Sequence, residues 1–280
     1  MQDIAGQTQI QEEAARQRKE PPLLIERRGA IVVLTLNRPA ARNSLSESML
    51  AALQSAVDEV SSDSGVRAVV VTAAGTAFSA GHDLKELTAR RTDPDGGRRF
   101  HDQIMRQCSR LMRSIVHCPK PIIAAVQGTA TAAGCQLVAT CDLAVASRTA
   151  KFCTPGVNIG LFCSTPMVAL SRNVSRKRAM EMLLLGEMIA AEAAADYGLV
   201  NRVVDPDKLM PEAMAMAQAL AAKSPATVAT GKEAFYRQIE MPLAEAYDYA
   251  SGVMVENMLH RDAEIGIGAF LEKRQPEWKG

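Results

Sequence analysis

Aromatic side chains, long apolar runs and paired cysteines are scarce or missing in this sequence. Only 4% of the 280 residues are aromatic while 48% are hydrophobic, so a large core must be built mainly from small and flexible side chains. No apolar run approaches the roughly 20 residues that a helix needs to cross a bilayer, so we expect no membrane span. The first 22 residues lack the apolar stretch of a secretory signal, and we interpret them as a polar N-terminal arm.

The cysteines and the charge balance exclude further classes. Six cysteines are scattered without a C-x-x-C pair, which predicts reduced thiols, a cytoplasmic location and no metal site. The 32 basic and 31 acidic residues give a net charge of +1, so nothing indicates binding to nucleic acid. Any site for an anion must therefore be local.

Strand-like and helix-like segments alternate over residues 23–205. Runs 23–26 and 30–36 predict a hairpin, and Ser46 is the predicted N-cap of a helix that reaches about Val60. Apolar runs at 66–72, 121–126 and 143–146 predict strands covered on both faces. Residues 98–117 have helical spacing. The alternation predicts an α/β fold with parallel strand pairs.

The pattern changes after about Val204. Residues 206–271 show only helical periods, with breaks at Ser224-Pro225 and Met241-Pro242, which predicts about three helices. We therefore divide the chain into an arm (1–22), an α/β core (23–205) and a C-terminal helical region (206–280).

Two loops rich in small residues each lead towards a helix, at 78–84 and 128–137. Small side chains let a ligand approach the main chain, and free N–H groups at a helix start favour negative charge. Two such N–H groups converging on one carbonyl oxygen would stabilise an oxyanion. Either loop alone is weak evidence, because Gly and Ala after a strand are most often turn and packing residues.

Together the loops resemble the enoyl-CoA hydratase/isomerase (crotonase) superfamily. Residues 78–84, FSAGHDL, resemble its F-x-A-G-x-D-[LI] segment, and residues 128–142 resemble G-x-A-x-G-G-G-x-E-L-x-x-x-C-D. Further segments follow in the family's order, at 36–45, 120–128, 152–161, 186–200 and 270–274. The resemblance covers about residues 23–280 and is specific for the superfamily, not for one reaction.

The resemblance implies a spiral of ββα turns followed by helices that form trimers, often paired into hexamers. It also implies that the backbone N–H groups of His82 and Ala133 form an oxyanion hole for the thioester carbonyl of an acyl-CoA. Coenzyme A is then part of the substrate, and no separate cofactor is expected.

The resemblance further implies contacts with coenzyme A. Arg38 and Arg42 are candidates for its phosphates, and Phe270 and Lys273 match positions that often reach a neighbouring subunit's nucleotide. A solvated surface cation is the alternative for each basic residue. The small-residue loops add Ala80, Gly81, Asp83, Leu84 and Gly134, with Asp83 alternatively a helix cap.

The chain departs from the family at the positions that move protons. Two glutamates do this in the hydratases, and here Gln136 and Gly156 stand at those places, while Ser164 stands where some members carry Asp. An amide does not transfer protons, and each acid–base group typically contributes about 10²–10⁴ in rate. The sequence therefore argues against ordinary hydration, and we expect that restoring both glutamates would raise it.

Three hypotheses follow. The first is an enzyme of the enoyl-CoA hydratase/isomerase type, a lyase or isomerase in fatty acyl-CoA metabolism. The second is a different acyl-CoA reaction, such as decarboxylation, isomerisation or thioester hydrolysis. The third is a non-catalytic acyl-CoA-binding protein. Nucleophilic catalysis by Cys135 is a weaker alternative, because Cys is also a common small core residue.

Overall fold

The computed structural model describes residues 20–279, and its first element is the predicted hairpin. Strand β1 (Leu23–Arg28) pairs antiparallel with β2 (Ile31–Leu36), so β1 continues through both arginines that we expected in the turn. Gly29 makes the turn with a φ of 64°, which glycine adopts at little cost. The predicted N-terminal arm lies outside the described residues, apart from residues 20–22.

Two sheets form the core. The first has six strands in the order β1-β2-β3-β5-β7-β10, and every pair after the hairpin is parallel. The second has four strands in the order β4-β6-β8-β9. Their bounds are β3 Ala68–Ala73, β4 Ala77–Ser79, β5 Ile122–Val126, β6 Thr129–Thr131, β7 Leu143–Ser147, β8 Lys151–Cys153, β9 Ile189–Ala190 and β10 Arg202–Val204.

Consecutive strands alternate between the sheets. β3 is followed by β4, β5 by β6 and β7 by β8, and a helical segment follows each pair. This is the predicted spiral of ββα turns. The helices of the core are α2 Glu47–Ser62, α3 Leu84–Ala89, α4 Arg98–His117, α5 Ala133–Thr140, α6 Pro166–Asn173, α7 Arg176–Leu185 and α8 Ala191–Asp196.

Local sequence signals set several helix bounds. Ser46 caps α2 as predicted, because its side chain accepts a hydrogen bond from the Met49 N–H at 3.2 Å. Helix α4 has the predicted bounds, with Ile104, Cys108, Leu111 and Ile115 on its buried stripe.

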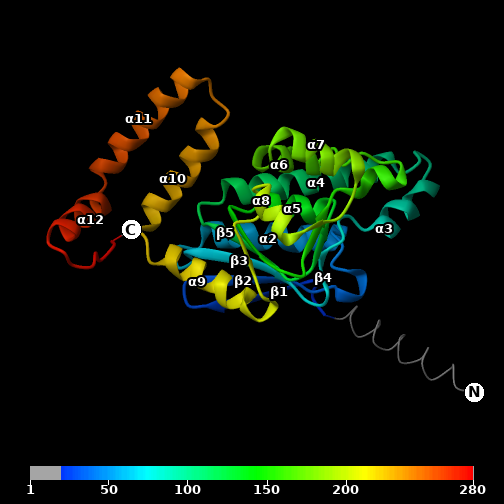
Figure 1. The fold of residues 1–280 in the computed structure, drawn as a ribbon, viewed down its shortest axis with the longest axis horizontal. Coiled ribbons are helices and arrows are strands. Elements are labelled where there is room, and N and C mark those ends of the chain that lie inside the picture. Colours follow the sequence, from blue (N-terminus) through cyan, green and yellow to red (C-terminus); the bar gives the residue numbers. More distant parts are fainter. Residues whose placement is uncertain (1–19, 280) are drawn as a thin grey trace, which may run out of the picture.

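Strand side chains alternate between two hydrophobic clusters. Val32 and Val69 point into the larger cluster, which α2, α4 and α5 complete, while Val33 and Val70 point to the other face. Helix α9 (Leu209–Ala221) covers that other face (Figure 1) with Leu209, Ala213 and Ala217.

The region after residue 205 differs from the prediction. It holds four α-helices where about three were expected: α9, α10 Pro225–Gln238, α11 Leu243–Leu259 and α12 Arg261–Leu271. Helix α9 packs on the sheet, whereas α10–α12 project from the core (Figure 1) and contact it through α10. We call α10–α12 the C-terminal lobe. Its separation from α9 follows from packing, which helical periodicity does not reveal.

Candidate functional site

Asn43 joins the loop after β2 to the loop around β4. Its side-chain amide donates to the carbonyls of Ala74 and Ala77, both at 2.8 Å, and its Oδ1 accepts from the Arg38 N–H at 2.8 Å. It is fully buried and has a φ of 51°, which Asn tolerates better than most residues. We predicted no role for Asn43, although an Asn shortly after the N-R-P stop is a usual mark of such a turn.

Backbone hydrogen bonds then fix the first small-residue loop. The Leu45 N–H donates to the Gly81 carbonyl at 2.7 Å, and the Ala80 N–H donates to the Arg42 carbonyl at 3.0 Å. The Ser79 hydroxyl donates to the Asn43 carbonyl at 2.8 Å. Residues 79–82 are therefore held by residues 42–45 and are not a loose surface loop.

Asp83 is the N-cap of α3, as predicted. Its Oδ1 accepts from the N–H groups of Lys85 and Glu86 at 3.1 and 3.4 Å. Its Oδ2 accepts from the Ser44 hydroxyl at 3.0 Å and from Arg38 at 3.5 Å. Arg38 is thus already paired with a carboxylate and is a weaker candidate for a phosphate contact.

The two small-residue loops touch at Gly81. A Cβ built on Gly81 would lie 3.1 Å from the Ala133 nitrogen and 3.0 Å from the Ala132 Cβ. Gly81 has a φ of 85°, and Ala132, the residue before α5, has the unusual φ of 49°. Among residues 20–279, neither the His82 nor the Ala133 N–H donates a hydrogen bond. The fold therefore packs the loop that carries His82 against the start of α5.

Helix α5 reaches this place because Gly134 has no side chain. A Cβ there would lie 2.8 Å from the Ser79 Cβ, closer than real Cβ atoms approach one another. All eight residues of α5 are buried. The helix start is therefore fixed against β4, as a preorganised donor requires.

Two buried polar side chains beside these donors lack partners. Gln136 is 4% exposed and its Oε1 has no hydrogen bond within the described chain, and neither do the two ring nitrogens of His82. Burial lowers the pKa of His82, and the nearby Leu45 carbonyl opposes this only in part. A buried polar atom without a partner costs about 1–3 kcal/mol, so a ligand that bonds it relieves that cost.

Neighbouring residues leave no room for a side chain at position 156. A Cβ built on Gly156 would lie 2.7 Å from the Leu161 carbonyl oxygen and 3.0 Å from the Cys163 Sγ. Ser164 is exposed and donates to the Phe162 carbonyl at 3.3 Å. Of the three substituted positions, only Gln136 places a buried polar group in the core.

Comparison with known proteins identifies the family of this chain. The family described as Enoyl-CoA hydratase/isomerase matches residues 26–280. The chain belongs to the enoyl-CoA hydratase/isomerase family. A Mycobacterium smegmatis crystal structure described as an enoyl-CoA hydratase is 53% identical, with a TM-score of 0.89 over 93% of this chain and 100% of that one.

A human relative adds to this family assignment. Enoyl-CoA hydratase domain-containing protein 3, mitochondrial, of Homo sapiens is 45% identical over 95% of this chain and 86% of its own length. A crystal structure described as human enoyl Coenzyme A hydratase domain-containing protein 3 is 46% identical, with a TM-score of 0.88 over 92% of this chain and 100% of that one.

The predicted cytoplasmic location is wrong. The human relative and its counterparts from Xenopus laevis and Rattus norvegicus are all named as mitochondrial proteins. Reduced cysteines argue against secretion but do not separate one reducing compartment from another, which is why the sequence misled. No helix of residues 20–279 is long and apolar enough to cross a membrane.

Three thiols lie near Gly156. Cys135, Cys153 and Cys163 are buried, and burial raises the pKa of Cys153 to about 11 and that of Cys135 further. Burial also raises the pKa of Cys163, with the Gly156 N–H opposing. Neutral thiols are poor nucleophiles, which argues against the Cys135 alternative. Residues 20–279 hold no cluster of three or more His, Cys, Asp or Glu suited to a metal.

The expected nucleotide contacts are not brought together within one chain. Phe270 is 82% exposed at the end of α12, and Lys273 follows two residues after that helix. Figure 1 places α12 at the opposite end of the molecule from α3, which begins beside His82. Arg42 is exposed and forms no ion pair in the described part of the chain.

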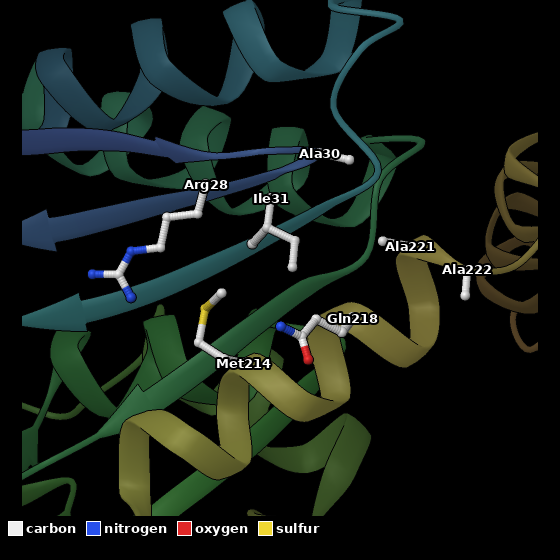
Figure 2. Close-up of a pocket in the computed structure, with 7 residues that line it drawn as sticks. All are labelled: Arg28, Ala30, Ile31, Met214, Gln218, Ala221 and Ala222. Carbon is white, nitrogen blue, oxygen red and sulfur yellow. The ribbon is translucent and has the colours of Figure 1, made fainter.

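A groove of about 660 Å³ lies elsewhere, between the hairpin and α9. Figure 2 shows Met214 and Gln218 of α9 facing Arg28 and Ile31 across it. None of the predicted site residues lines this groove. Arg28 is already paired with Glu26 at 2.8 Å, so no unpaired charge marks the groove as an anion site.

Proposed function

We propose that the chain binds an acyl-CoA thioester and polarises its carbonyl between the N–H groups of His82 and Ala133. The contact of Gly81 with Ala132 and Ala133 carries the proposal, because it brings two undonated N–H groups together on fixed backbone. Preorganised donors of this kind stabilise a developing oxyanion without reorganising during the reaction. Family membership supports the same ligand.

Coenzyme A would run from this hole along the first loop. Ala80 and Leu84 offer exposed surface to its pantetheine and adenine, while the buried Gly81 and Gly134 let the two loops pack closely beside it. Arg42 is a better phosphate partner than Arg38, which shares Asp83. Leu84 is exposed, as a residue beside a bound nucleotide would be in the free protein.

A second copy of the chain would complete the nucleotide site. Phe270 lies in α12 and Lys273 just after it, and α12 is at the opposite end of the molecule from α3 (Figure 1). The lobe that carries them exposes a row of large apolar side chains, among them Leu243, Tyr247, Met258 and Leu259. A homotrimer or hexamer would cover these side chains and deliver both residues.

Several reactions are compatible with the proposed ligand. An enoyl-CoA hydratase/isomerase activity in fatty acyl-CoA metabolism fits the family, but positions 136 and 156 carry Gln and a closely packed Gly in place of the two glutamates that move protons. This observation favours a second candidate, in which an oxyanion is stabilised without paired carboxylates: the enolate of a decarboxylation or isomerisation, or the tetrahedral intermediate of thioester hydrolysis. A non-catalytic acyl-CoA-binding protein is the third.

Titration calorimetry with coenzyme A and with several acyl-CoA thioesters tests the proposal. We expect saturable acyl-CoA binding, and no binding at millimolar ligand would contradict it. Turnover assays on crotonyl-CoA, on a malonyl-type thioester and on saturated thioesters then separate the candidates. Binding without any turnover would identify a binding protein.

A further inference from the structure

Lys232 of α10 is buried against the core although it is charged. Its Nζ donates to the Asp142 Oδ2 at 2.7 Å, to the Ile115 carbonyl at 3.0 Å and to the Lys120 carbonyl at 3.1 Å. The side chain is only 7% exposed. An ammonium has three protons to donate, and here all three have acceptors.

The three acceptors come from three different segments of the core. Ile115 lies in the last turn of α4, where a cation also meets the favourable end of the helix dipole. Lys120 lies in the loop before β5, and Asp142 lies between α5 and β7. One side chain of the C-terminal lobe therefore contacts the end of α4, the loop before β5 and the segment between α5 and β7.

The Asp142 carboxylate also has three hydrogen-bond donors. Its carboxylate accepts from the Ile122 N–H at 2.7 Å and from the Tyr236 hydroxyl of α10 at 3.0 Å, besides Lys232. Burial raises the pKa of Asp142, and Lys232 is the first of the groups that oppose this. Removing one partner of such a pair is costly, because the other charge stays buried and unpaired.

The rest of α10 offers little that would hold the lobe in one orientation. Apart from the Lys232 side chain, nothing in α10 is buried. A second ion pair between core and lobe joins Arg172 to Glu240 at 3.0 Å, but its side chains are 54% and 60% exposed. Exposed pairs contribute little, so Asp142, Lys232 and Tyr236 are the stronger tie. We call these three residues the lobe anchor.

The lobe anchor is also connected to the proposed oxyanion hole. Asp142 follows the C-cap of α5, Cys141, and Ala133 is the first residue of the same eight-residue helix. A helix of this length spans roughly 12 Å and moves as a unit. Helix α5 therefore holds an oxyanion donor at one end and the lobe anchor at the other.

We propose that Asp142, Lys232 and Tyr236 are positioning residues that set the angle of the C-terminal lobe against α5. They thereby bring Phe270 and Lys273 to the nucleotide of an acyl-CoA bound by a second copy. This inference rests on the proposed function. The anchor touches no substrate, and its effect on binding is transmitted through the lobe.

The test compares Lys232→Met with Arg172→Ala in the full chain. Each is titrated with an acyl-CoA and with the matching acyl-pantetheine thioester, which lacks the nucleotide. For Lys232→Met we expect the acyl-CoA Kd to rise about tenfold or more, because small misplacements of binding groups are costly. The acyl-pantetheine Kd should stay within about twofold, since the hole is intact, and Arg172→Ala should change neither by more than that.

Trypsin provides a second measurement that needs no ligand. Lys223 is exposed in the link between α9 and α10, so a loosened lobe should be cut there about tenfold faster. Tyr236→Phe keeps the ion pair and removes one hydrogen bond, so it should show a smaller increase in both measurements. It also serves if Lys232→Met fails to fold, which circular dichroism would reveal.

The possible outcomes judge the lobe anchor and the delivery of Phe270 and Lys273 separately. A folded Lys232→Met chain with wild-type cleavage and wild-type acyl-CoA affinity would overturn the anchor. Equal weakening for both thioesters would overturn the delivery to the nucleotide and leave a structural role only. If the wild-type chain binds no acyl-CoA, the proposed function and the delivery both fall, while the cleavage rates still judge the anchor.

Discussion

The carbonyl oxygen of Leu161 lies where a side chain of Gly156 would begin. A Cβ on Gly156 would be 2.7 Å from that oxygen, so position 156 is occupied by the neighbouring loop and is not an empty space awaiting a side chain. The sequence suggested that glutamates at 136 and 156 would restore hydration. That remains a prediction, and the structure adds that a Glu at position 156 must displace residues 161–163.

Gly156→Ala should therefore lower the free energy of unfolding by about 1–3 kcal/mol, the usual cost of overpacking. Gly252→Ala is the control, because nothing lies within 4 Å of a Cβ at that position in α11. That change should stabilise the chain by about 0.4–1 kcal/mol. Denaturant unfolding of both variants measures the difference, and equal midpoints would show that residues 161–163 yield easily.

Gly81→Ala should damage the proposed site beyond its effect on stability. Alanine at a positive φ costs roughly 1–2 kcal/mol, and here the new methyl group also presses on the Ala133 nitrogen at 3.1 Å. Acyl-CoA affinity should fall at least about tenfold, equivalent to about 1.4 kcal/mol. Gly29→Ala is the control, because Gly29 also has a positive φ but nothing lies within 4 Å of a Cβ built there. This variant should lose stability through backbone strain alone. Retained affinity in Gly81→Ala would mean that the two loops do not hold the thioester.

His82→Gln should make stability less dependent on pH. Burial lowers the pKa of folded His82 below the value of about 6.5 expected when unfolded. Below that pH the unfolded chain takes up a proton that the folded chain does not, so His82 destabilises the fold as pH falls. Thermal melts between pH 7.5 and 5.5 should show a smaller loss in the variant. An unchanged loss would mean that His82 is protonated in the folded chain.

The cysteines should be slow to react in the folded chain. All six are buried, and burial raises the pKa of Cys108 to about 12 and that of Cys153 to about 11. Since the thiolate is the reactive form, Ellman's reagent at neutral pH should label little thiol within minutes. All six should react once the chain is unfolded in guanidinium. Rapid labelling of one thiol would reveal a reactive cysteine and would support the hypothesis of nucleophilic catalysis.

Local signals explain what could be predicted. The bounds of α4 follow from helical spacing, and the caps at Ser46 and Asp83 depend on N–H groups two or three residues away. Such features involve neighbours in sequence, so composition and spacing are enough. The loops around His82 and Ala133 were found because small residues before a helix mark a close approach of the main chain.

The sequence by itself determined the family, the ββα order of the core and the substitution of carboxylates by Gln136 and Gly156. Only the tertiary structure decided that Gly81 meets Ala133, that Leu161 closes position 156 and that α9 belongs to the sheet while α10–α12 stand apart. The loops at Gly81 and Ala133 are about 50 residues apart, and their contact depends on how two sheets and α5 pack. Packing of distant segments is a property of the whole chain, and no local pattern encodes it.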